Sequence, residues 1–317
     1  MVTKNIAKQK EPALKTFFRD VVRNRTLLLM LLPGMLLVFV FSYIPMGGVV
    51  LAFKRFNYQD GIFGSPWVGF QNFIFFFSSG TAFKVTRNTA LYNIAFIIVN
   101  TTVELLFAVI LCEMAGTRLK KGIQSFIFLP YFIGWVIVGS IVYTLFSYEY
   151  GIVNNLLSSL GISRVNFYSS PGYWPFIIVL INAWKGIGYG MVVYMAAITG
   201  VDPALSEAAV IDGANIYQRT IHVTLPSVLN TTVILLLLSI GGIFRGNLQL
   251  FYQLIGSNGM LFDMTDVIDT YVYRLLLQAT DMGQTIAIGF YQSALCLVTI
   301  LLANRLVKSW DPDYTLF

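Results

Sequence analysis

The feature that most constrains this chain is an uncharged apolar run from Leu27 to Ala52. A helix needs about 20 apolar residues to cross a hydrocarbon core about 30 Å thick, and this run is longer. Of the 317 residues, 56% are hydrophobic and 11% charged, too few charges for a water-facing shell. Further apolar stretches lie at about 88–112, 125–146, 174–199, 228–244 and 283–304. The sequence therefore predicts an all-α polytopic membrane protein with six transmembrane helices.

Proline and glycine predict irregularities in these spans. Pro33 and Pro45 lie within the first run and predict kinks or irregular ends. Glycines at 241, 242 and 246 follow the fifth stretch, which is the shortest. The tract 247–281 is too polar to face lipid throughout, so part of it is expected to be a loop or a helix that lines protein or water.

Lys and Arg residues predict the orientation of the chain. With alternating connections, thirteen of the 21 lie on the side of both termini, seven lie on the other side, and Lys185 lies within a span. Because cytoplasmic segments are rich in basic residues, both termini are expected in the cytoplasm of a bacterium, with the chain in its inner membrane. We divide the chain into a cytoplasmic tail at 1–26, a transmembrane domain at 27–310 and a cytoplasmic tail at 311–317.

The tail before the first span has a helical amphipathic pattern. Its apolar residues are spaced i, i+3, i+4, i+7 and i+8: Leu14, Phe17, Phe18, Val21 and Val22. Lys and Arg residues lie on the other face of the same helix. This pattern is typical of a basic helix in the cytoplasmic interface, with a solvated tail as the alternative. The apolar run that follows is too long for the apolar region of a signal peptide, so the first span is expected to be retained.

Several kinds of chemistry lack the residues they need. The two cysteines, Cys112 and Cys296, lie in apolar runs, and His222 is the one histidine, so the sequence offers neither a disulfide framework nor a metal site. The basic residues lie between apolar runs, so we expect no nucleic-acid partner. The glycines at 186, 188 and 190 lie within a span and lack the spacing of a nucleotide loop, which favours close helix packing.

Polar residues inside the spans are candidates for a substrate path, because burial without a partner is costly. The first three share one helix face, since they are seven and four residues apart: Asn93, Asn100 and Glu104. The other candidates are Asn182, Trp184, Lys185, Gln249 and Tyr252. Glu104 and Lys185 can pair with each other, and a helix contact for Glu104 is at least as good an explanation as a substrate contact.

The connection at about 200–227 has the pattern of a compact helical knob. Asp202 or Ser206 can cap a first helix, Gly213 interrupts it, and a second amphipathic stretch is expected to stop at Pro226. Small side chains here allow another protein to approach closely, and the carboxylates of Glu207 and Asp212 can pair with its basic groups.

This connection resembles the EAA loop of the permease subunits of type I ABC importers, the binding-protein-dependent family. The resemblance is carried by Glu207-Ala208-Ala209, Asp212-Gly213-Ala214 and Val223-Thr224-Leu225-Pro226. The sequence departs from the family pattern at Thr220, Val223 and Asn230, where Phe, Ile and Pro are common.

The resemblance extends over most of the chain and favours the branch that imports oligosaccharides and polysaccharides. The chain is similar to the lipoprotein-associated polysaccharide permeases and the first alginate-importer permease at Leu32-Pro33-Gly34, Gly64-Ser65-Pro66-Trp67-Val68-Gly69-Phe70, the tract 266–274 and Tyr314-Thr315-Leu316-Phe317. An alginate-like polymer is therefore the substrate that the resemblance suggests.

The resemblance implies a type I ABC importer permease fold and a set of partners. These are a second homologous permease, two ATP-binding subunits that hold ATP and Mg²⁺, an extracytoplasmic solute-binding protein and membrane lipid. The chain itself would bind no cofactor and would not be catalytic. The knob would insert into a groove of an ATPase, with Glu207 and Asp212 pairing there and Gly213 permitting the bend.

Two other classes remain open. An ion-coupled secondary transporter or channel would need paired ionisable groups in the membrane or inverted repeats, and neither is evident. An intramembrane enzyme would need a catalytic constellation, and none is visible. No Gly-x-x-x-x-Gly-Lys-Ser/Thr sequence occurs, so a transporter driven by ATP must take its energy from another polypeptide.

Overall fold

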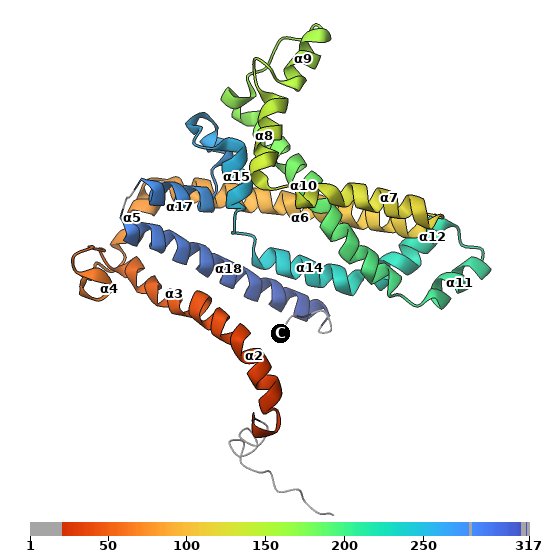
Figure 1. Ribbon diagram of the computed structural model, residues 1–317, viewed down its shortest axis with the longest axis horizontal. Helices are drawn as coiled ribbons and strands as arrows, with labels where there is room; N and C mark the ends of the chain where they lie inside the picture. The colour runs from red at the N-terminus through yellow and green to blue at the C-terminus, as the bar shows by residue number, and fades with distance from the viewer. Residues whose placement is uncertain (1–20, 279–280, 312–314, 316–317) are drawn as a thin grey trace, which may run out of the picture.

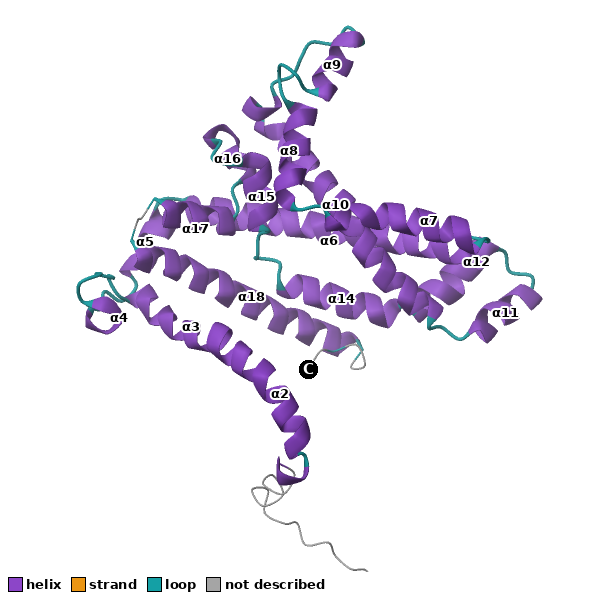
Figure 2. Ribbon diagram, in the orientation of Figure 1, coloured by secondary structure: helices purple, strands orange, loops and turns teal. Residues whose placement is uncertain are grey.

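The computed structural model describes residues 21–278, 281–311 and 315 of the chain (Figure 1). Within these residues the structure is helical, and the only β-type pairing is an isolated bridge between Lys54 and Trp67 (Figure 2). Four helical stretches are long and apolar enough to cross a membrane, and there are six if each of two bent helix pairs is one span. The prediction of an all-α polytopic protein is confirmed. The expected interfacial positions Leu14, Phe17 and Phe18 lie outside the described residues.

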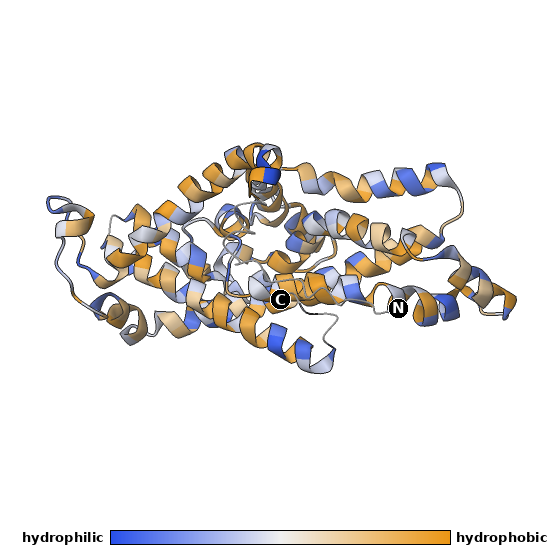
Figure 3. Cartoon of the chain, turned by 90° about the horizontal axis from the view of Figure 1, so that it is seen from below, coloured by the Kyte–Doolittle hydropathy of each residue, from blue (hydrophilic) through white to orange (hydrophobic). Residues whose placement is uncertain are grey.

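The four unbroken spans agree with the predicted stretches, and each is longer than its prediction. They are Arg25–Phe53, Thr81–Glu113 (α6), Pro171–Thr199, which contains α10 (Trp174–Thr199), and Met282–Trp310 (α18). Hydrophobic residues cover the helices along most of their length (Figure 3). Such a surface suits lipid or a partner helix far better than water.

Proline makes the first span irregular, as predicted. It consists of α2 (Arg25–Val38), a π-helical segment (Phe39–Tyr43), α3 (Ile44–Met46) and a 3₁₀ segment (Gly47–Phe53). The π-helical segment comes directly before the turn that holds Pro45. Because proline lacks an N–H and clashes with the carbonyl four residues earlier, a locally wider turn relieves that clash.

The predicted single span over 125–146 is wrong in its shape. The chain forms α7 (Thr117–Phe128), a 3₁₀ turn (Leu129–Phe132) and α8 (Trp135–Phe146), and the two parts meet at an angle of 97°. Pro130 lies in the 3₁₀ turn, and Gly134 has extended backbone angles. Proline and glycine together thus end one helix and allow the next to start in a new direction.

The fifth span is also bent. Ile216–Ser227 and α14 (Leu229–Gly241) meet at 57°. After α14, the tract 247–281 returns into the protein as α15 (Leu248–Ile255), a 3₁₀ turn (Gly259–Leu261), α16 (Phe262–Thr265) and α17 (Ile268–Leu277). Leu250, Phe251 and Val267 are buried in the main hydrophobic cluster. The expectation that part of this tract lines protein is confirmed.

Short elements lie at two other places in the molecule. α4 (Gly61–Gly64) and α5 (Gln71–Ser78) lie beside the start of α6 and α18 (Figure 1). α8, α9 (Ile152–Ser159), the 3₁₀ turns Phe167–Ser169 and Pro171–Tyr173, and the first part of α10 project together as an arm. The Asn154 amide joins this arm internally by donating to the carbonyls of Ser147 and Val165.

Lys54 is basic and lies on the side of the chain where basic residues are fewer. Its Nζ donates to the carbonyls of Ile62 and Phe63 at 3.0 and 2.8 Å, and it lies 5.1 Å from the Trp67 ring centroid. The side chain is buried by these contacts. Lys54 therefore stabilises the α4 turn. This structural role explains why a basic residue lies on that side of the chain, without any effect on how the chain is oriented in the membrane.

Glycines on α10 allow its neighbours to come close. A Cβ atom at Gly188 would lie 2.6 Å from the carbonyl oxygen of Ile127 and the Cα of Phe128 in α7. A Cβ atom at Gly190 would overlap the Glu104 carboxyl of α6. The prediction that this glycine run serves close helix packing is confirmed.

We predict that Gly188→Ala destabilises the protein. The added methyl group must separate α10 from the backbone of α7, and overpacking of this kind costs about 1–3 kcal/mol. The thermal unfolding midpoint of the purified protein is therefore expected to fall by several degrees. Gly34→Ala is the matched control, because its Cβ would meet nothing within 4 Å. Equal midpoints for the two variants would contradict this account of α10 packing.

Candidate functional site: a central cavity and a helical knob

An open cavity of about 700 Å³ lies between α6, α10, α14 and the segment that leads into α15. This volume is in the range of ligand sites in proteins. Its lining is rich in amide, hydroxyl and charged side chains. The polar lining residues are Asn93, Asn100, Thr101, Glu104, Asn182, Tyr189, Tyr194, Ser239, Arg245, Asn247 and Gln249.

The structure brings together five of the eight residues predicted for the substrate path. Asn93, Asn100 and Glu104 line the cavity from α6, Asn182 lines it from α10, and Gln249 lines it from α15. The spacing of seven and four residues on α6 thus does place its three polar side chains on the face of one cavity.

The other three predicted path residues lie elsewhere. Trp184 lines a separate apolar hollow with Phe107 and Ile127. Tyr252 packs edge-on against Tyr273, with ring centroids 5.0 Å apart. Neither side chain is among those that line the central cavity.

Lys185 stabilises the bend between α7 and α8. Its Nζ donates to the carbonyls of Pro130 and Tyr131 at 3.3 and 2.8 Å. It also lies 5.2 Å from the ring centroid of Trp135, at the start of α8. The suggested pair between Glu104 and Lys185 is therefore replaced by bonds to the corner, because the 97° bend leaves carbonyls that can accept from a side chain as well as from the backbone.

We predict that Lys185→Met destabilises this corner. Hydrogen bonds that involve a charged group contribute about 1.5–3 kcal/mol, so the thermal midpoint should fall measurably. Lys121→Met, an exposed position on α7, is the control and should leave the midpoint unchanged. A Lys185→Met protein as stable as the control would contradict the role given to this side chain.

Arg245 is a charged residue of the cavity wall that the sequence pattern did not indicate. It was counted as one of the basic residues on the far side of the membrane, because a linear sequence does not show that the chain turns back into the protein after α14. The glycines at 241, 242 and 246 were the available signal. In the structure they surround a break in the helix, and the break carries Arg245 into the cavity.

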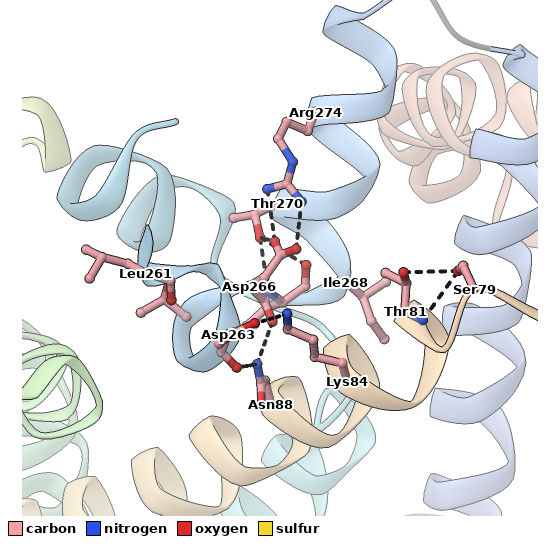
Figure 4. A network of polar contacts seen from close by, with 12 residues as sticks. Ser79, Thr81, Lys84, Asn88, Leu261, Asp263, Asp266, Ile268, Thr270 and Arg274 are labelled. Carbon is pink, nitrogen blue, oxygen red and sulfur yellow. Dashed lines mark hydrogen bonds and ion pairs between the residues drawn. The ribbon is translucent and has the colours of Figure 1, made fainter. Parts of the chain in front are cut away.

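Polar contacts join the tract after α15 to α6, as Figure 4 shows in part. The buried Asp266 carboxylate accepts two bonds from Arg274, at 3.1 and 2.6 Å, and one from Thr270 at 2.8 Å. The Asn88 amide of α6 donates to the carbonyls of Asp263 and Asp266. This network fixes α16 and α17 against α6, beside the cavity.

An ion pair lies at the edge of this network. Lys84 of α6 pairs with Asp263, and the Lys84 ammonium lowers the pKa of the Asp263 carboxyl. Because Asp263 is exposed to solvent, this pair is screened and contributes little to stability. The buried Asp266–Arg274 pair is therefore the stronger tie.

The connection after α10 forms the expected knob at one end of the bundle (Figure 1). α11 (Pro203–Ile211) is capped by Asp202, whose carboxylate accepts from the Ala204 N–H at 3.0 Å. Gly213 follows with φ +85°, a conformation that other residues adopt at a cost. α12 (Ile216–Arg219) starts at a capping box formed by Asn215 and Gln218.

One ion pair fixes the knob to the spans. Arg219 of α12 donates to the Glu113 carboxylate, at the end of α6, at 2.7 Å. Beside it, a hollow of about 290 Å³ is lined by Ser206, Glu207, Val210, Ile211 and Arg219. This pair joins the knob directly to the end of α6.

The knob leaves apolar side chains exposed. Ile211 is 85% exposed, Tyr217 is 71% exposed, and Leu205, Val210 and Ile216 are each more than half exposed. The motif residues Glu207, Ala208, Asp212 and Gly213 are exposed as well, and Ala209 and Ala214 are half-buried. Clustered apolar residues that water would otherwise surround indicate a surface for another protein.

The predicted helix stop at Pro226 is wrong by one residue. A π-helical segment (Thr220–Thr224) is followed by α13 (Leu225–Ser227), which contains Pro226 near its start. The wider π turn again accommodates a proline that follows it, as at Pro45. The direction changes at Val228, where the 57° bend begins.

The matched family model covers the knob and the cavity walls other than the α6 wall. Residues 105–311 match the family described as binding-protein-dependent transport system inner membrane component. This chain belongs to that family. The resemblance seen at the EAA-like loop is thus confirmed. As a member, the chain is a permease component of a transport system, and its fold is that of the type I ABC importer permeases.

Similar proteins include sugar-polymer permeases. The polygalacturonan/rhamnogalacturonan transport system permease protein YteP of Bacillus subtilis (strain 168) is 33% identical over 304 residues, 96% of this chain and 94% of YteP. A crystal structure of a bacterial ABC transporter involved in the import of the acidic polysaccharide alginate contains a chain that is 32% identical. It superposes with a TM-score of 0.83, over 93% of this permease and 99% of that chain.

A second solved structure of an alginate transporter is similar to the same degree. It is the bacterial alginate ABC transporter in complex with an alginate pentasaccharide-bound periplasmic protein. One of its chains has 32% identity and a TM-score of 0.82, over 92% of this permease and 97% of that chain. Both likenesses include the cavity and the knob, because they extend over nearly the whole chain.

Proposed function

We propose that this permease forms, with a second homologous permease, the translocation path of an ATP-driven importer for an oligo- or polysaccharide. A solute-binding protein would deliver the polymer, and two ATPase subunits would bind ATP and Mg²⁺. An alginate-like acidic polymer is the favoured cargo, because the similar proteins named above carry polygalacturonan, rhamnogalacturonan or alginate.

The observation that carries the proposal is the exposed knob. α11 and α12 present apolar side chains and the Glu207 carboxylate together, and Arg219 fixes the knob to α6. A groove on an ATPase would cover these apolar residues and supply basic groups or backbone N–H donors to the carboxylate. When ATP draws two ATPases together, the two knobs would move with them and tilt the spans between inward-facing and outward-facing states.

The cavity supports a path for sugars. Sugar recognition combines many hydrogen-bonding groups with aromatic rings, and this cavity offers both. Tyr189 contributes a ring that stacks on Tyr131, with centroids 5.2 Å apart and an interplanar angle of 15°. Asn182 and Gln249 supply amides.

The orientation of the chain follows from the position of the knob. α6 and α10 run toward the knob, α14 runs away from it, and α18 runs back toward it (Figure 1). If the knob meets an ATPase in the cytoplasm, the C-terminal end of α18 lies on the cytoplasmic side. The excess of Lys and Arg in the segments on that side supports the same orientation for both termini.

Reconstitution tests the proposal. The chain is assembled with its partner permease and ATPase in lipid vesicles, and ATP hydrolysis is measured with and without substrate-loaded binding protein. The expected result is a several-fold stimulation that depends on the loaded protein. If the chain forms no complex with an ATPase, the proposal fails and an ion-coupled secondary transporter or channel is favoured instead.

We predict that Gly213→Asp abolishes this stimulation. The substitution puts a side chain at a residue with φ +85° and adds a charge at the junction of α11 and α12, so the knob no longer fits its groove. The amount of protein in the membrane should be unchanged, and coupled uptake should fall at least about tenfold. Gly116→Asp is the matched control, because it has φ +98°, meets nothing within 4 Å and lies outside the knob. Normal coupled uptake by Gly213→Asp would contradict the role of the knob.

A further inference from the structure

The backbone around Arg245 is held in place by three other elements. The Gln292 amide of α18 donates to the Phe244 carbonyl at 2.8 Å, and the Asn93 amide of α6 donates to the Arg245 carbonyl at 3.0 Å. The Gly246 N–H donates to the Asp269 carboxylate of α17 at 2.5 Å. This irregular segment is therefore rigid although it lies between two helices.

Glycine is required at position 246 for this arrangement. A Cβ atom there would lie 2.8 Å from the Asp269 carboxylate oxygen and 2.9 Å from the Val267 side chain. Gln292 also donates to the same Asp269 oxygen, at 2.7 Å. Asp269 thus stabilises the backbone on both sides of Arg245 by accepting from Gly246 and by orienting Gln292.

The Arg245 backbone is hydrogen-bonded to other elements, whereas the Arg245 guanidinium is exposed to the cavity. The side chain is exposed at the wall of the central cavity, and no hydrogen bond or ion pair to its guanidinium is found within residues 21–278, 281–311 and 315. Both bonds to the nearby Asp269 oxygen come from Gly246 and Gln292. The Arg245 guanidinium, carried by a hydrogen-bonded backbone, is thus available to a ligand in the cavity.

The fork of N–H groups on a guanidinium matches a carboxylate. Guanidinium binds carboxylates in a bidentate manner, through two parallel charge-assisted hydrogen bonds. The N-terminus of α15 also lies at the cavity wall, through Asn247, Leu248 and Gln249. Its positive dipole end favours an anion at the same place.

A second group at the wall lacks a partner. Asn100 Oδ1 is buried and has no hydrogen-bond partner among the described residues, and Asn100 lines the cavity. An unpaired buried acceptor is costly. A sugar hydroxyl that donates to it removes this cost once the Asn100 side chain turns toward the cavity that it lines. The same wall thus offers an acceptor for a hydroxyl and a cation for a carboxylate, the two functional groups of a uronic acid unit.

We infer that Arg245 binds the carboxylate of a uronic acid unit in the translocation cavity and makes the path selective for acidic sugar polymers. This inference rests on the proposed function. Asn100 accepts from a hydroxyl of the bound sugar, and Asp269 is a positioning residue that acts through the backbone of the 244–247 segment.

The test measures binding to the permease complex without its binding protein. Trigalacturonate and its fully methyl-esterified form are titrated calorimetrically into the purified complex of both permeases and both ATPases. These probes have the same sugar skeleton and differ in charge. Wild type is expected to prefer trigalacturonate, and Arg245→Ala should weaken it at least about tenfold while leaving the ester unchanged.

Two further variants sharpen the result. Arg245→Lys keeps the charge but not the fork, so it should restore only part of the affinity for trigalacturonate. Arg305→Ala, an exposed arginine of α18 away from the cavity, should behave as wild type. The inference is overturned if Arg245→Ala binds trigalacturonate as wild type does, if it loses both probes equally, or if wild type binds neither probe.

Failure of the inference is separable from failure of the proposed function. The same wild-type complex is assayed for ATP hydrolysis with substrate-loaded binding protein. Stimulation without any preference for trigalacturonate overturns the role of Arg245 alone. Lack of stimulation overturns the proposed function, and the inference with it.

Discussion

The close approach of α6 and α7 to α10 is the constraint on which the rest of the structure depends. The backbone at Gly188 meets α7, and the backbone at Gly190 meets the Glu104 carboxyl of α6. Because glycine has no side chain, the three helices can approach closely and gain van der Waals contacts. Helices in membranes associate in this way, since lipid gives no hydrophobic driving force between them. The α6 and α10 walls of the cavity, and the corner that Lys185 stabilises, follow from this packing.

The same helices connect the cavity to the knob. α10 leads directly into α11, and α6 ends at Glu113, which pairs with Arg219 of α12. The knob is therefore joined to both helices that carry the polar cavity wall. In the proposed function, this arrangement would be the two-state element of an ATP-driven permease, with the knob as its input and the cavity as its output.

Regular patterns in the sequence predicted much of this arrangement. Asn93, Asn100 and Glu104 could be assigned to one face because helical spacing fixes relative direction along a straight helix. The same spacing says nothing of neighbouring helices. Lys185 was therefore placed in the path, although the bend after Pro130 presents two carbonyls to it.

Breaks in the helices were the harder part to predict. Arg245 was missed because its position depends on contacts with Asn93, Asp269 and Gln292, which are remote in sequence. Pro226 was expected to end its helix, yet the π turn before it lets the helix continue. Such local departures depend on tertiary contacts, and only a three-dimensional structure shows them.

The most direct test of this account is the accessibility of the cavity from outside the cell as a function of nucleotide. Tyr189→Cys is introduced with Cys112 and Cys296 replaced, and a membrane-impermeant thiol reagent is added externally to the assembled transporter. The account predicts labelling when ATP is trapped on the ATPases, and protection without nucleotide. Labelling that is the same in both states would contradict the coupling of the knob to the cavity.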